Sequence, residues 1–77
     1  MNDPLPTVGR VVHYTPVDGA TRKGQPYAAV ITHVWGPDCV NLSVQPDGSF
    51  PLIDPTPTSV VKGDPGTPRT WCWPPRA

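Results

Sequence analysis

The stretch that alternates most strictly is Cys39-Val40-Asn41-Leu42-Ser43-Val44. Successive side chains of a β-strand point to opposite faces, so Val40, Leu42 and Val44 share one face. This pattern predicts a strand with an apolar face toward a core. Pro46-Asp47-Gly48 follows as a turn signal, because proline presets the first central angle and glycine accepts a positive one.

Two hydrophobic runs precede this stretch. Val8 to Tyr14 is β-branched and aromatic and lies between two prolines, which predicts a first strand. Tyr27 to Trp35 is the longest apolar run and predicts a central strand covered on both faces. Gly36-Pro37-Asp38 predicts a turn after it, and the polar segment from Val17 to Gln25 predicts a loop before it.

Prolines and short apolar runs follow the alternating stretch. Phe50 to Pro57 has too many prolines for a central strand, so it predicts an extended edge that packs Phe50, Leu52 and Ile53. Thr58 to Val61 predicts a short strand, and Asp64-Pro65-Gly66 predicts a last turn. The tail then predicts a final strand.

The composition favours strands throughout. Thirteen prolines and the absence of glutamate make long helices improbable, because proline lacks an amide donor and blocks the helical conformation before it. Five short strands predict an all-β fold, a small helix-poor SH3-like barrel whose closure removes exposed sheet edges. An OB-like barrel is the alternative. We expect one domain over residues 1–77, with 1–6 as a flexible N-terminus and a core that includes Val11, Val30, Val40, Leu42, Val44 and Val60.

Charge and hydropathy exclude some partners. The net charge is zero, which removes the electrostatic footprint of a duplex nucleic-acid binder. No apolar run approaches the length that crosses a membrane, so we expect no membrane partner. The N-terminus lacks the basic and apolar regions of a secretion signal, so Cys39 and Cys72 are expected to be free thiols. A disulfide between them is the alternative.

No constellation typical of catalysis is present in the sequence. Every aspartate lies in a turn or beside proline or glycine, where its side chain bonds the local backbone. His13, His33, Cys39 and Cys72 lack the close paired spacing of structural zinc motifs, so no metal is expected. Neither cysteine has a catalytic signature around it. We therefore expect a protein that is not an enzyme and has no cofactor.

The tail Arg69-Thr70-Trp71-Cys72-Trp73-Pro74-Pro75-Arg76 places two tryptophans on alternate residues. Both rings would lie on one face of a strand, either filling the barrel or forming a binding surface. Tryptophan, tyrosine and arginine are enriched at binding hot spots. The predicted ligand-binding residues are Arg10, His13, Tyr14, Arg69, Trp71 and Trp73. A thin core with surplus aromatic surface also predicts a homo-oligomer whose interface includes Trp73 or Phe50.

The order of several motifs resembles a group of small proteins encoded by tailed phages and prophages. Their pattern runs Gly-Arg-x-Val-His-Tyr, Ile-Thr-x-Val-Trp, Cys-Val-Asn and a terminal Gly-Thr-Trp-His-Trp-Pro. The matching residues span nearly the whole chain, from Val8 to Pro75. Two departures are that Pro68-Arg69 interrupt the Gly-Thr-Trp run and that Cys72 stands where histidine is usual. The resemblance implies a phage origin but no mechanism. Together with the lack of a secretion signal, it makes the host cytoplasm the expected location.

Two classes of function follow from these observations. The favoured hypothesis is an oligomeric sponge that sequesters a small nucleotide-type immune signal, gripped by arginine and stacked on aromatic rings. The alternative is a virion or assembly protein, or an inhibitor of a host protein, that docks through an aromatic surface.

Overall fold

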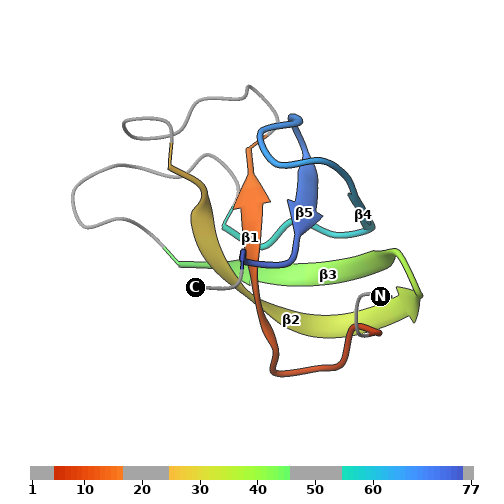
Figure 1. Ribbon diagram of the computed structural model, residues 1–77. Coiled ribbons are helices and arrows are strands. Elements are labelled where there is room, and N and C mark those ends of the chain that lie inside the picture. The colour runs from red at the N-terminus through yellow and green to blue at the C-terminus, as the bar shows by residue number, and fades with distance from the viewer. Residues whose placement is uncertain (1–4, 17–24, 46–54, 76–77) are drawn as a thin grey trace.

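The computed structural model describes residues 5–16, 25–45 and 55–75 of the 77-residue chain. These residues form five strands, β1 (Val11–Thr15), β2 (Tyr27–Gly36), β3 (Cys39–Val44), β4 (Val60–Lys62) and β5 (Thr70–Cys72). The strands close into a barrel in chain order, with β5 pairing back onto β1 (Figure 1). The predicted all-β, SH3-like five-stranded barrel is confirmed. Within the described ranges no helix is long and apolar enough to cross a membrane.

The β2–β3 hairpin is the longest part of the barrel wall. Its turn lies at Pro37 and Asp38, as predicted. The pairing shifts register twice, between Ile31 and His33 and again between Val34 and Gly36, and each shift leaves one extra residue on β2. Such bulges bend a strand and re-aim its side chains. They fall where β2 runs toward the turn.

An extended segment lies along β3 without being a strand. The backbone N–H of Leu42 donates to the carbonyl of Pro57 at 3.0 Å, and that of Val44 donates to Pro55 at 2.7 Å. Proline suits this place, because it can accept a hydrogen bond although it has none to donate. The predicted extended edge is confirmed for these residues. The rest of that prediction, with Phe50, Leu52 and Ile53, and the predicted Pro46-Asp47-Gly48 turn lie outside the described residues.

The connection between β4 and β5 contains a turn and brings Gly63 close to Thr70. The predicted turn is present, since Thr67 N–H donates to the Asp64 carbonyl at 3.1 Å and Gly66 adopts a φ of 87°. β4 and β5 then pair in parallel. A Cβ atom on Gly63 would stand 2.7 to 2.9 Å from side-chain atoms of Thr70. Only glycine fits at this position without a shift of its neighbour.

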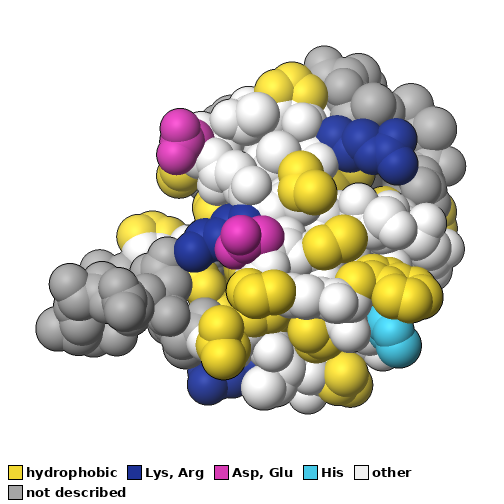
Figure 2. Space-filling model, turned by 90° about the vertical axis from the view of Figure 1, so that its right-hand side faces the viewer, with side chains coloured by type: hydrophobic (Ala, Val, Ile, Leu, Met, Phe, Trp, Pro, Cys, Tyr) yellow, Lys and Arg dark blue, Asp and Glu magenta, His cyan; other side chains and the backbone are white. Residues whose placement is uncertain are grey.

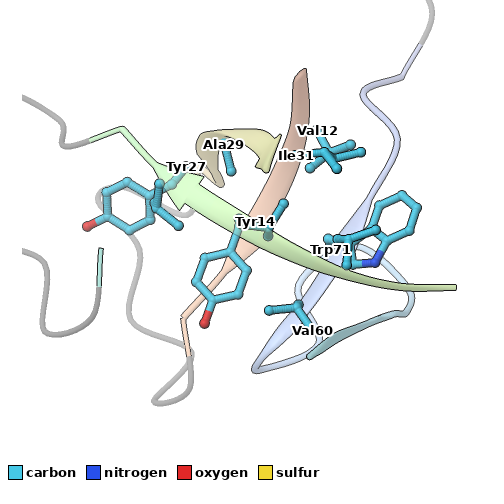
Figure 3. Packing of buried hydrophobic residues seen from close by; sticks show 10 residues of the cluster. Val12, Tyr14, Tyr27, Ala29, Ile31, Val60 and Trp71 are labelled. Carbon is cyan, nitrogen blue, oxygen red and sulfur yellow. The ribbon is translucent and has the colours of Figure 1, made fainter. Parts of the chain in front are cut away.

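The core fills the barrel interior from all five strands. Figure 3 shows rings and aliphatic side chains of β1, β2, β4 and β5 pointing toward one another. The predicted core positions on β3 and β4 are confirmed. The buried apolar residues are Val12, Tyr14, Tyr27, Ala29, Ile31, Val40, Leu42, Val44, Val60 and Trp71.

The prediction that Val11 points into the core from β1 is wrong. Val11 is 52% exposed, whereas Val12 is fully buried. The strand also begins at Val11 and not at Val8, because Gly9 adopts a φ of 94° in a turn where Arg10 N–H donates to the Thr7 carbonyl at 3.2 Å. Val11 and Val12 are both apolar and point to opposite faces of the strand. The sequence alone therefore did not distinguish which of them points inward.

The coverage predicted for β2 is also wrong. Buried residues alternate with exposed or half-buried ones from Tyr27 to Ile31, and Val30 is only half-buried. Thr32 and His33 are then both exposed. The strand therefore has one face in the core and one outside. Outward side chains of β2 such as Val30 are apolar because such residues favour strands, and not because a second layer covers them.

Candidate functional site

Two of the predicted binding residues lie in the core. Tyr14 and Trp71 are cross-strand partners on β1 and β5, with 4% and 0% of their surface exposed. The indole N–H of Trp71 donates to the backbone carbonyl of Asp38 at 3.2 Å. A fully buried ring offers no face to a ligand, so the stacking role predicted for these two side chains is wrong. Both fill the barrel, which for Trp71 is the alternative interpretation of the tail.

The two predicted arginines lie at opposite ends of β1. Arg10 immediately precedes the strand, whereas Arg69 N–H donates to the carbonyl of Thr15 at its far end, at 2.9 Å. The stretch of strand between Arg10 and Thr15 spans about 16 Å. Both residues are exposed, and their side chains start from opposite ends of the strand.

Arg10 and Trp73 do come together at one end of the barrel. The Cζ atom of Arg10 lies 5.9 Å from the centre of the Trp73 ring, within cation–π range. Trp73 is half-buried and meets Trp71 edge to face, with ring centres 5.4 Å apart. The predicted alternate tryptophans therefore do share a face, but one lies inside the core and the other covers its end.

His13 faces a thiol on the outside of the barrel. It is half-buried and pairs across strands with Cys72. Burial raises the pKa of the Cys72 thiol, and the nearby charge of Lys62 opposes that rise only in part. The thiol therefore stays protonated near neutral pH, which is the opposite of an activated nucleophile. Both Cys72 and Cys39 are free thiols.

Sequence reasoning missed the most exposed aromatic residue of the described chain. Trp35 has 61% of its surface exposed. Its ring meets that of His33 at a centre-to-centre distance of 4.3 Å and an interplanar angle of 60°. Figure 2 shows a histidine beside a broad group of hydrophobic atoms on the side of the molecule that holds the β2–β3 turn.

The side chain of Asn41 holds this indole in place. Its Oδ1 atom accepts a hydrogen bond from Trp35 Nε1 at 2.9 Å and a second from the backbone N–H of Ser59 at 2.8 Å. Ser59 has a φ of 53°, so Asn41 also stabilises an unusual backbone conformation just before β4. One amide thus fixes the Trp35 ring against β3 and the start of β4.

We call this surface the Trp35 face. It comprises outward residues of β2, β3 and β4, namely His33, Trp35, Cys39, Asn41 and Val61, of which Cys39 and Val61 are cross-strand partners and Val61 is 52% exposed. The sequence held one signal for it, because Trp35 stands directly before the Gly36-Pro37 turn and so at the rim of the sheet. The two bulges that re-aim His33 and Trp35 have no local signature.

A search for similar proteins found no matching family model, no matching curated protein and no matching solved structure. The resemblance to small phage proteins therefore stays a prediction. Among the described residues there is no group of three or more histidine, cysteine or acidic side chains that could hold a metal ion. The features that bear on function are the Trp35 face and the contact between Arg10 and Trp73.

Proposed function

We propose that this protein is a non-enzymatic binding module that docks on another protein through the Trp35 face. The observation that supports the proposal is an exposed indole held in one orientation by Asn41. Tryptophan is the residue type most enriched at interface hot spots. Monomeric proteins also seldom expose large apolar groups in a cluster unless the cluster is used.

The pinned indole lowers the cost of binding. Ordering a side chain at an interface costs about 0.5 to 1.5 kcal/mol, and the Trp35 ring is already ordered before a partner arrives. Its N–H is occupied by Asn41 and cannot also serve a partner's carbonyl. Only the ring face and edges remain for contact. The partner should therefore present an apolar or flat side chain, not a backbone acceptor.

The resemblance to phage proteins supports a proposal about where such a partner would be found. We propose a phage origin and action in the host cytoplasm, with a capsid or tail component or a host protein as the partner. A homo-oligomer is part of the proposal, because Val11 is half exposed and its cross-strand partner Val30 is only half-buried on the outer side of β1 and β2. Of the interface residues predicted earlier, Trp73 is half-buried and Phe50 lies outside the described residues.

Trp35→Ala should abolish partner capture. Tagged protein recovered from phage-producing cells and weighed by native mass spectrometry should retain a protein partner and report the number of copies. We expect Trp35→Ala to reduce the retained partner at least tenfold, as hot-spot tryptophans do. The exposed ring is not core, so unfolding free energy should change by less than about 1 kcal/mol.

Val8→Ala is the matched control, since Val8 is 66% exposed but precedes β1 and is not part of the Trp35 face. It should retain the partner. If folded Trp35→Ala protein retains as much partner as the wild-type protein does, docking through this face is refuted.

A small nucleotide-type ligand is the second candidate. The contact between Arg10 and Trp73 favours it, because arginine grips phosphate bidentately beside an aromatic ring. The site is smaller than the one predicted from the sequence, as Tyr14 and Trp71 are buried and Arg69 lies at the other end of β1. We keep the sponge for an immune signal as a proposal on this reduced site.

Thermal shift with cyclic dinucleotides, cyclic trinucleotides, NAD-derived cyclic signals and mononucleotides tests the sponge. A ligand at one hundred times its dissociation constant should stabilise the fold by about 2.7 kcal/mol. Arg10→Gln should remove the shift. Arg69→Gln is the control and should leave it unchanged, because Arg69 lies at the opposite end of the strand. If no compound raises the melting temperature, the sponge proposal fails.

A further inference from the structure

The three tryptophans differ in how their indole N–H groups are satisfied. Trp35 donates to Asn41 Oδ1, and Trp71 donates to the Asp38 carbonyl. The Nε1 atom of Trp73 is buried and has no hydrogen-bond partner, and no other described side chain has a buried nitrogen or oxygen in that state. A buried donor without an acceptor is costly, so native proteins seldom leave one. This end of the barrel therefore lacks an acceptor.

A positive charge stands over the ring that carries this donor. The guanidinium of Arg10 lies 5.9 Å from the centre of the Trp73 ring and is exposed. Among the described residues, the side-chain carboxylates are those of Asp38 and Asp64, in the turns after β2 and after β4. An unmet donor and an exposed arginine thus occupy one end of the barrel.

The chain brings these two groups together where β1 begins and β5 ends. β1 and β5 are antiparallel, and the pairing of His13 with Cys72 places the residue after β5 beside the beginning of β1. Trp73 comes directly after the last residue of β5, and Arg10 directly before the first residue of β1. Both lie just beyond the ends of their strands, although the carbonyl of Arg10 still accepts from the Ile31 N–H at 2.9 Å. Their side chains are less enclosed than the fully buried indole of Trp71, since Arg10 is exposed and Trp73 is half-buried.

We propose that Arg10 and the Trp73 N–H form a recognition pair for an oxyanion. The guanidinium supplies the charge and two parallel donors, and the indole supplies a third donor that has no acceptor in the free protein. The ligand class is a phosphate or carboxylate group. Because the Trp73 donor is covered, the ring turns on binding so that Nε1 donates to an oxygen of the anion. The guanidinium of Arg10 then leaves the Trp73 ring and contacts the anion. This inference rests on the second candidate function and names the ligand group that its site takes.

Indole N–H signals in proton–nitrogen NMR spectra provide the test. Full-length protein gives one such signal for each of its three tryptophans, and Trp73→Phe identifies the one that belongs to Trp73. Sodium phosphate, a mononucleotide and sodium acetate are titrated separately, against sodium chloride at equal ionic strength. We expect the Trp73 signal to move downfield and saturate, while the Trp35 and Trp71 signals stay in place.

Matched variants separate recognition from nonspecific charge effects. Arg10→Gln should weaken the apparent affinity at least tenfold, whereas Arg69→Gln should leave it within twofold. Equal apparent affinities for phosphate and the mononucleotide identify the phosphate group as the part that is bound. A higher affinity for the mononucleotide shows that the nucleoside is contacted as well. Saturation with acetate shows that a carboxylate is accepted. A Trp73 signal that does not saturate with any of the three, or that saturates equally in Arg10→Gln, overturns the inference.

Failure here is distinguishable from failure of the proposed functions. Docking through the Trp35 face is judged by Trp35→Ala, which leaves Arg10 and Trp73 untouched. If nucleotides raise the melting temperature while the Trp73 signal stays fixed, a nucleotide site exists but this pair is not its anion-binding part.

Discussion

Replacing Trp71 with alanine is expected to leave the barrel largely unfolded. The indole is fully buried and belongs to a core cluster that draws residues from all five strands, part of which Figure 3 shows. Removing a buried tryptophan costs about 3 to 5 kcal/mol. A domain of this size has only about 5 kcal/mol to lose. Urea denaturation followed by circular dichroism measures the loss.

Two variants serve as controls for Trp71→Ala. Trp71→Phe keeps a ring in the cavity but loses the hydrogen bond to the Asp38 carbonyl, so it should cost about 1 to 2 kcal/mol. Trp35→Ala removes an exposed ring of the same size and should cost less than about 1 kcal/mol. A loss below about 1 kcal/mol for Trp71→Ala would contradict its place in the core.

A lysine at position 12 should prevent folding, and a lysine at position 11 should be tolerated. Val12 is fully buried opposite Ala29, which is also fully buried. Val12→Lys would place an unpaired charge in the core, which exceeds about 4 kcal/mol and approaches the whole stability of the domain. Val11→Lys changes a side chain that is half exposed in the single chain, so the free energy of unfolding, measured at a concentration where the protein is monomeric, should change by about 0.5 kcal/mol or less.

Denaturant midpoints of the two lysine variants give the comparison. The pair has nearly the same sequence change at adjacent positions, so only the direction in which each side chain points differs between them. If Val11→Lys unfolds the protein and Val12→Lys does not, the inward face of β1 has been assigned the wrong way round.

Local signals predicted the strands whose patterns were unambiguous. Alternation from Cys39 to Val44 identified β3 and its inward face, because a polar residue separates every apolar one. Turn chemistry at Gly36-Pro37-Asp38 and Asp64-Pro65-Gly66 marked the ends of strands. The number of short strands and the many prolines then left a small closed barrel as the economical way to hide sheet edges.

The candidate site was harder to predict, because the roles of two tryptophans were exchanged. The sequence pattern allows Trp71 a place on a binding surface or in the barrel, and Trp71 fills the core. The same kind of pattern predicts that Trp35 lies in a covered strand, whereas Trp35 is exposed. Both residues follow patterns compatible with either location. The difference arises from two bulges in β2 and from the pairing of β5 with β1, neither of which has a local sequence signal.

The sequence by itself determined the class of fold, the turns and the inward face of β3, because these depend on neighbouring residues along the chain. Tertiary structure decided which valine of β1 points inward, which tryptophan is core, and that Arg10 meets Trp73 while Arg69 does not. The physical reason is that side-chain direction in an all-apolar run is set by burial against partners distant in sequence. Closing the barrel joins β1 to β5 and thereby places residues from the two ends of the chain in contact.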